Sequence, residues 1–79
     1  MIPLYGFLAG DTIGLLILAH PDDSADALCG KLQSAASVRV APLRHPVVIH
    51  RGKRLHPRET VRELAIEPLD RFDVVEDGG

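Results

Sequence analysis

The sequence predicts a single α+β domain in which a mixed β-sheet packs on one helix. Two strand-like runs, residues 2–8 and 12–19, flank a short turn, an apolar helical stripe follows them, and further strand-like runs come after it. A chain of 79 residues is one small domain with a modest core. We therefore expect residues 1–79 to form one unit, with Gly78 and Gly79 as a flexible tail.

The first two runs predict a β-hairpin. Pro3 fits only near the start of a strand or on its unpaired side, and Gly10 is free to adopt the positive φ of a tight turn. Alternate residues of the second run are apolar on both faces, with Ile13, Leu15 and Ile17 on one face and Gly14, Leu16 and Leu18 on the other. We expect the face of Leu16 and Leu18 to be covered by a partner, or by a second copy in isolation.

A helix is predicted within residues 20–36. Its apolar stripe follows the i, i+3, i+4, i+7 spacing at Ala25, Leu28, Cys29 and Leu32. Asp23 is the expected N-cap, and Asp26 suits the positive end of the helix dipole. Gly30 costs a helix about 1 kcal/mol relative to alanine, which predicts a short helix. Cys29, the one cysteine, is expected to be a small buried hydrophobe.

The second half of the chain contains shorter elements. Residues 38–42 are expected to be briefly extended, and residues 45–52 to form a strand that ends at its glycine. Residues 53–60 are polar and form a connection. Residues 61–66 predict a single helical turn, and residues 71–77 alternate as a last strand.

Charge is unevenly distributed along the chain. Seven of the nine basic residues fall between positions 39 and 62, opposed there only by Glu59: Arg39, Arg44, Arg51, Lys53, Arg54, Arg58 and Arg62. A solvated charged face is the simplest interpretation, and a docking surface for an acidic protein is the alternative. Aromatic residues make up only 4% of the chain, which argues against nucleic-acid binding.

Nothing in the sequence predicts a membrane segment, a catalytic group, a cofactor or a metal. The apolar stretch 13–19 is too short to span a bilayer and the N-terminus lacks the basic region of a signal peptide, so a cytoplasmic protein is expected. The four histidines have neither the i, i+4 helical spacing nor a Cys-x-x-Cys beside them. No serine or cysteine lies in a recognisable nucleophile motif. A binding or scaffolding role is favoured.

Two stretches of the chain resemble ubiquitin. "LAGDTIGL" has the hairpin spacing of that family, and "VIHRGKRLHPRETVRELAIEPLDRFDVV" is similar to its second half. The resemblance implies the β-grasp fold, and it implies that Leu8, Ile49 and Val75 match the apolar recognition patch of that family. A positive rim around this patch would be formed by Arg51, Lys53 and Arg54. An apolar centre with a polar rim is typical of interfaces, although these residues also fit a simple covering of the sheet.

Other segments are similar to a more specific family. "DSADALCGKL", "RVAP", "LHPRET" and "DVVED" resemble the small protein B of toluene and related aromatic monooxygenase systems, which is itself ubiquitin-like. In that family the small subunit docks on a di-iron hydroxylase built from two large subunits, and it carries no iron ligand. The resemblance implies a non-catalytic bacterial subunit without a cofactor, whose partner is the large subunit of a di-iron hydroxylase.

The C-terminal pair Gly78-Gly79 supports an alternative function. A ubiquitin-like protein modifier or a sulfur carrier would act through the carboxylate of Gly79. The preceding Glu76 and Asp77 are acidic where the tail of ubiquitin is basic, so the fit to a ubiquitin-type activating enzyme is expected to be poor. We expect the di-glycine to be an end and not a chemical handle. A free-standing binding module of the same fold is a third possibility.

Overall fold

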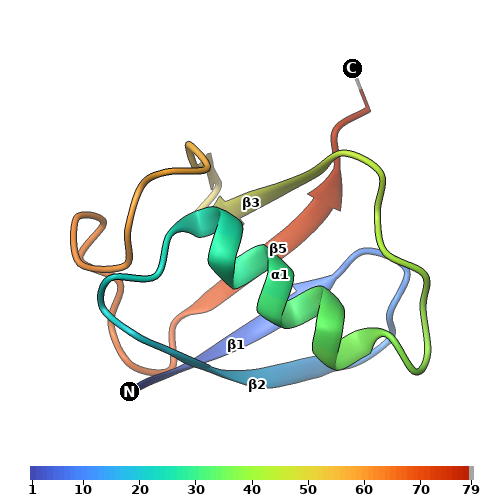
Figure 1. Cartoon of the computed structure of the whole chain (residues 1–79), viewed down its shortest axis with the longest axis horizontal. Helices are drawn as coiled ribbons and strands as arrows, with labels where there is room; N and C mark the ends of the chain where they lie inside the picture. The colour runs from blue at the N-terminus through green and yellow to red at the C-terminus, as the bar shows by residue number, and fades with distance from the viewer. Residues whose placement is uncertain (79) are drawn as a thin grey trace.

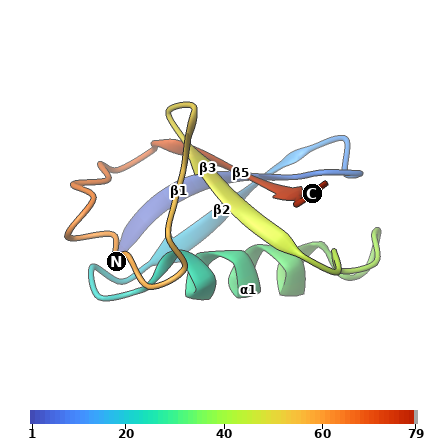
Figure 2. The same cartoon turned by 90° about the horizontal axis from the view of Figure 1, so that it is seen from above.

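The structure, a computed structural model, describes residues 1–78. These residues form, in chain order, β1 (Ile2–Leu8), β2 (Gly14–Ala19), α1 (Ala25–Ala36), β3 (Pro46–His50), β4 (Lys53–Arg54) and β5 (Arg71–Glu76). The helix crosses one face of the sheet (Figure 1). Seen from above, helix and sheet are two layers, and no other helix or strand of the described chain covers the far face of the sheet (Figure 2). The predicted mixed sheet packed on one helix is confirmed.

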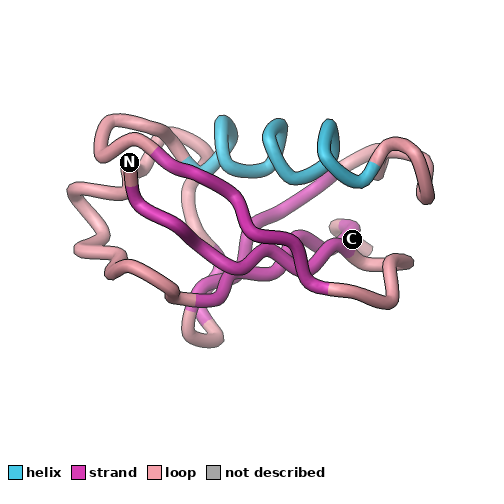
Figure 3. The backbone as a smooth tube through the Cα atoms, turned by 90° about the horizontal axis from the view of Figure 1, so that it is seen from below, coloured by secondary structure: helices cyan, strands magenta, loops and turns pink. Residues whose placement is uncertain are grey.

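The sheet has the strand order β2-β1-β5-β3-β4. β1 and β2 form the predicted antiparallel hairpin, and Gly10 has the expected positive φ of 92° in its turn. β5 inserts between β1 and β3, parallel to β1 and antiparallel to β3, so that the two ends of the sequence form the centre of the sheet. Figure 3 shows these strands as one layer beneath the helix, with long loops at both ends.

The core lies between α1 and the inner face of the sheet. Ala25, Leu28, Cys29 and Leu32 are all buried, as the helical spacing predicts. They pack against alternate residues of the central strands, where Leu4 and Val74 are fully buried and Phe72 is nearly so. The alternation of buried and exposed residues along these strands leaves a second set of side chains on the opposite face.

The helix differs from the prediction at its start and in its length. Its N-cap is Ser24, whose Oγ accepts a hydrogen bond from the Ala27 N–H at 3.1 Å. Asp23 is not the cap because its carboxylate accepts the His20 N–H at 2.8 Å and the Lys31 ammonium at 2.6 Å. The helix runs for 12 residues and is not short, because the packing of its buried stripe outweighs the cost of Gly30.

One predicted element of the second half is absent from the described chain. Residues 38–42 are a turn and a loop and not an extended segment. Residues 61–66 form the expected single turn, in which the Leu64 N–H donates to the Thr60 carbonyl at 3.0 Å. Thr60 and Glu63 exchange the reciprocal hydrogen bonds of a helix-starting capping box. Ala65 ends this turn with a left-handed φ of 52°, and Ile66 is buried in the core.

Candidate docking surface

The face of the sheet that points away from α1 carries an unusually apolar set of side chains. We call it the outer sheet face. Pleating of the strands places alternate residues on this face. Its members are Pro3, Tyr5 and Phe7 from β1, Leu16 and Leu18 from β2, Val47 and Ile49 from β3, and Arg71, Asp73 and Val75 from β5.

One apolar half of the outer sheet face lies on the β1–β2 hairpin. Leu16 is 57% exposed, Leu18 is 52% exposed and Tyr5 is 44% exposed. Tyr5 lies directly across from Leu16, and Pro3 lies across from Leu18, so these side chains adjoin one another. Leu16 and Leu18 therefore lie where the alternation of their strand predicts, on a face that the described chain leaves open. Tyr5 was not among the predicted residues, although the alternation of its own strand points to it.

The other apolar half lies on β3 and β5. Ile49 and Val75 are half-buried there, and Val47 lies directly across from Val75. The ubiquitin resemblance predicts Leu8 as a third member of this patch, and the structure contradicts that placement. Leu8 is only 3% exposed, because it belongs to β1 and points into the core opposite Val74. Ile49 and Val75 thus share the outer sheet face, whereas Leu8 does not.

Arg71 and Asp73 separate the two apolar halves. The Arg71 guanidinium carbon lies 4.0 Å from the centre of the Phe7 ring, which is a cation–π contact. The Arg71 Nη2 donates to Asp73 Oδ1 at 3.0 Å. In the middle of the face, therefore, Arg71 is paired with Asp73 and stacks on the ring of Phe7. Apolar side chains lie on both sides of this pair.

The basic rim is largely neutralised by acidic neighbours. Arg51 contacts Asp70 at 3.3 Å and Arg54 contacts Asp77 at 2.9 Å. Lys53 makes no ion pair with any residue of the described range. Elsewhere Arg39 and Arg62 pair with acids far away in sequence. The basic cluster in the sequence is thus dispersed in space, which favours the solvated charged face over a dedicated surface for an acidic protein.

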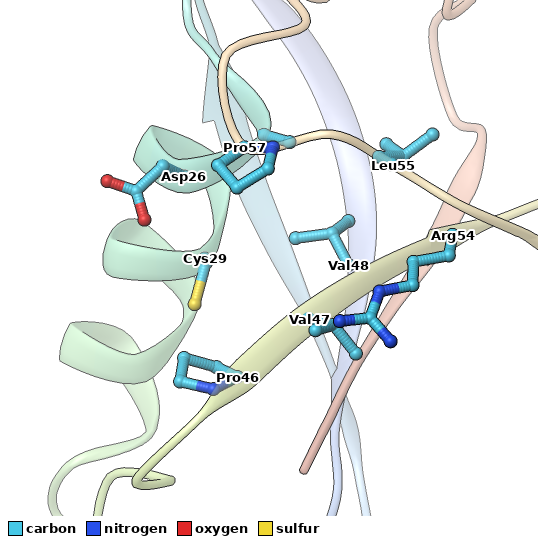
Figure 4. Close-up of a pocket in the computed structure, with 9 residues that line it drawn as sticks. Asp26, Cys29, Pro46, Val47, Val48, Arg54, Leu55 and Pro57 are labelled. Atoms are coloured by element: carbon cyan, nitrogen blue, oxygen red, sulfur yellow. The ribbon is translucent and has the colours of Figure 1, made fainter. Parts of the chain in front are cut away.

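Two hollows in the surface do not resemble ligand pockets. The first, about 70 Å³, lies between α1 and β3 and is lined by Cys29 on the helix side and by Pro46, Val48 and Leu55 on the other (Figure 4). Typical small-molecule pockets are roughly 300–1,000 Å³, so it holds no more than a side chain. The second is a larger hollow of about 300 Å³ that is lined by the charged side chains of Arg51, Asp70, Arg71 and Asp73 beside His50 and Gly52. Its lining does not suit an aromatic hydrocarbon.

The sequence of the chain matches that of a known protein family. The model of the family described as toluene-4-monooxygenase system protein B (TmoB) matches residues 1–75. The chain belongs to this family. No curated protein sequence matches it. Membership confirms the resemblance drawn from the four sequence segments.

Solved structures confirm the ubiquitin-like fold of this protein B family member. A chain of the toluene 4-monooxygenase HD complex with the inhibitor 4-bromobenzoate superposes with a TM-score of 0.88 and 22% identity, over 96% of this chain and 98% of that one. Caldiarchaeum subterraneum ubiquitin gives a TM-score of 0.79 and 20% identity, over 99% and 98% of the two chains. A protein designed on ubiquitin gives 0.81 and 23%, over 99% and 90%.

The reactive side chains of this family member are engaged in structural contacts. Burial raises the pKa of the Cys29 thiol, and the nearby Asp26 charge raises it further, so the thiol stays protonated. His50 is buried, and its Nε2 lies 3.2 Å from Asp70 Oδ2. Within residues 1–78, no three His, Cys, Asp or Glu side chains are grouped closely enough to hold a metal ion.

In the same range no helix has the length and apolar character needed to cross a membrane.

The acidic end of the chain is tied to the domain. The Glu76 carboxylate accepts the backbone N–H groups of Arg44 and His45 at 2.9 and 2.6 Å. The Asp77 N–H donates to the His45 carbonyl at 2.8 Å, and its carboxylate accepts from Arg54. Only Gly78 follows in the described range, and Gly79 lies outside it. Glu76 and Asp77 are therefore held against the loop before β3 and against β4.

Proposed function

We propose that this chain is the small, non-catalytic subunit of a bacterial multicomponent di-iron aromatic-hydrocarbon monooxygenase, and that it docks on a large hydroxylase subunit through the outer sheet face. Family membership supports the monooxygenase system as its setting. The observation that carries the docking face is the exposure of Leu16, Leu18 and Tyr5 on the face of the sheet that no helix or strand of the described residues covers (Figure 2).

The composition of the outer sheet face is that of an interface. Monomeric proteins rarely leave a contiguous apolar patch of this kind open, and such patches mark contact sites. Tyrosine and arginine are enriched among the residues that contribute most to binding. Tyr5 and Arg71 lie side by side at the middle of the face, directly across from one another in the sheet. The apolar halves then exclude water around them.

The side chains of this subunit indicate which tasks fall to it and which fall to the large subunits. The irons and the substrate pocket would belong to the large subunits. This chain offers a protonated thiol, a buried His50 paired with Asp70, and hollows that do not suit the substrate. Its contribution is to stabilise or position the large subunit in the cytoplasm. The modifier or sulfur-carrier alternative at Gly78-Gly79 is disfavoured by the anchoring of Glu76 and Asp77.

A paired substitution tests this function. The Leu16→Lys/Leu18→Lys variant should remain folded, since both side chains are exposed, and should co-purify poorly with the large subunits because two charges would be buried at the contact. The matched control is Ala35→Lys/Val38→Lys, which adds the same charge at exposed positions at and beyond the end of α1. Equal recovery of hydroxylase with both variants would exclude the outer sheet face as the docking surface.

A further inference from the structure

β2 is an edge strand, and its backbone groups divide into paired and open sets. In β1, the Tyr5 N–H donates to Asp70 and the Pro3 carbonyl accepts from Leu69, so the odd-numbered residues of β1 face β5. The even-numbered residues face β2. Through the register of the hairpin, the backbone groups of Leu15, Ile17 and Ala19 face β1, whereas those of Gly14, Leu16 and Leu18 point away from the sheet.

Only one of these outward groups has a partner in the described chain. The Leu18 carbonyl accepts a hydrogen bond from the Lys31 Nζ at 2.9 Å, and the same ammonium lies 2.6 Å from Asp23 Oδ2. The N–H and C=O groups of Leu16 and Gly14, and the Leu18 N–H, make no hydrogen bond to residues 1–78. The open edge is therefore a row of backbone groups with one charged residue at its end.

We propose that an extended segment of the large hydroxylase subunit adds to β2 as a further strand of the sheet. This inference rests on the proposed function and names the kind of contact that is made at one border of the outer sheet face. An added strand would satisfy the open groups of Gly14, Leu16 and Leu18 through ladder hydrogen bonds. Its alternate side chains would continue the apolar row of Leu16 and Leu18, so they should be apolar.

Lys31 defines the charge of the added segment. When an added strand takes over the Leu18 carbonyl, the Lys31 ammonium keeps Asp23 but loses its second acceptor. A carboxylate on the added segment, placed beside the Leu18 end of β2, would replace that acceptor with a stronger one. The segment is therefore extended, apolar at alternate positions and acidic at one end.

A second copy of this chain fits the same edge poorly. In a symmetric antiparallel pairing of two β2 strands, the Leu18 end of one copy lies beside the Gly14 end of the other. Lys31 would then approach the hairpin turn of the other copy. There Asp11, whose side chain is only 3% exposed, is already paired with Arg39 at 2.6 Å. The ammonium would meet a guanidinium in place of a free acid. Charge complementarity thus favours a different partner.

Proline at position 16 separates strand addition from simple covering of the face. The Leu16 N–H has no partner in the free chain, and proline is tolerated on an edge strand when its missing donor faces outward. Leu16→Ala and Leu16→Pro both shorten the side chain, but only the second removes the donor. For strand addition, Leu16→Pro should bind the purified large subunits roughly tenfold more weakly than Leu16→Ala, because an acceptor of the partner is left unsatisfied. Thermal unfolding of both variants verifies that each is folded.

The outcomes are distinguishable. Equal affinities of the two variants would overturn strand addition while leaving the docking face intact. Failure of the unmodified chain to bind the large subunits would overturn both proposals. Self-association of the free chain that Leu16→Pro abolishes, with no difference between the two variants on the hydroxylase, would show a second copy as the occupant. Lys31→Gln should weaken binding roughly threefold. The control is Arg58→Gln, which removes one positive charge at an exposed position outside the outer sheet face. Unchanged affinity of Lys31→Gln would overturn the acidic complement.

Amide hydrogen exchange gives an independent readout without substitution. In the free subunit the amides of Leu15 and Ile17 are bonded to β1 and should exchange slowly, whereas those of Leu16 and Leu18 should exchange rapidly. In the complex with the large subunits all four should be slow. A complex that forms while the Leu16 and Leu18 amides still exchange rapidly would overturn the proposal.

Discussion

Gly6 lies on the inner side of β1 where the helix approaches the sheet closely. A Cβ at this position would lie 2.8 Å from Leu32 Cδ1 and 2.9 Å from Phe72 Cζ, both of them side chains in the buried core. Gly30, in the middle of α1, has no such neighbour within 4 Å. Glycine is therefore required by the packing at position 6, whereas a larger residue fits at position 30.

Alanine substitutions should therefore have opposite effects at the two positions. Gly6→Ala should lower the free energy of unfolding by about 1–3 kcal/mol, because the added methyl overpacks the core. Gly30→Ala should raise it by about 1 kcal/mol, because alanine is the better helix former and the site is open. Urea unfolding of both variants measures these changes. A Gly6→Ala variant as stable as the unmodified chain would show that the helix does not pack on β1 as described.

Asp70 ties the loop before β5 to the end of β3. Burial alone would raise the pKa of its carboxyl, but the Glu67 N–H, His50 and the Arg51 charge together hold the pKa below its usual range. A carboxyl with a lowered pKa in the folded state contributes stability above its unfolded pKa, and this contribution is lost as the pH falls through the folded value. The same direction holds for Asp23, where burial is again outweighed, chiefly by the hydrogen bond from Lys31.

The free energy of unfolding should accordingly fall as the pH is lowered below about 4, the ordinary range of an aspartate. Asp70→Asn cannot titrate, so its stability should decline less steeply over the same interval. Chemical unfolding at a series of pH values compares the two slopes. Identical slopes would mean that the Asp70 contacts do not favour its ionised form.

At the scale of elements, the β2 edge and the C-terminal segment have contrasting environments. β2 is open along its outer side, whereas the end of β5 is fastened by Glu76 to the loop before β3 and by Asp77 to β4. The first is suited to contact with another protein. The second is held by contacts within the domain.

Deletion of Gly78 and Gly79 should therefore leave assembly of the hydroxylase and its turnover unchanged. The anchoring contacts of Glu76 and Asp77 precede the deleted residues and are retained. Intact-mass spectra of the protein from its native cells should show a free carboxylate at the C-terminus. A thiocarboxylate mass, or a remnant of Gly79 joined to other proteins, would instead support the sulfur-carrier or modifier function.

At the scale of the whole molecule, the sequence predicts what depends on local periodicity. The hairpin, the buried stripe of α1 and the outward position of Leu16 and Leu18 follow from spacings of two and of three to four residues. The features it missed depend on contacts between distant segments. Lys31 and the His20 N–H engage Asp23 and leave the cap to Ser24, and Val74, from the other end of the chain, faces Leu8 in the core.

The sequence also does not predict the ion pairs at the surface, because they too join distant segments. Arg39 and Arg54 belong to one basic stretch of the sequence, yet their acidic partners, Asp11 and Asp77, come from opposite ends of the chain. The spacing of residues along the sequence does not predict such pairs. The outer sheet face has an apolar surface with a paired ionic centre at Arg71 and Asp73. Of the three basic residues that the alignment with ubiquitin places at its rim, Arg51 and Arg54 are paired with acids.

Methyl NMR of the complex tests the docking face most directly. The chain, labelled at its leucine, isoleucine and valine methyl groups, is titrated with unlabelled large hydroxylase subunits. The signals of Leu16, Leu18, Ile49 and Val75 on the outer sheet face should shift or broaden, while that of Val38, which is 85% exposed beyond the end of α1, should not. Perturbation of Val38 with unchanged signals from Leu16 and Leu18 would contradict docking through the outer sheet face.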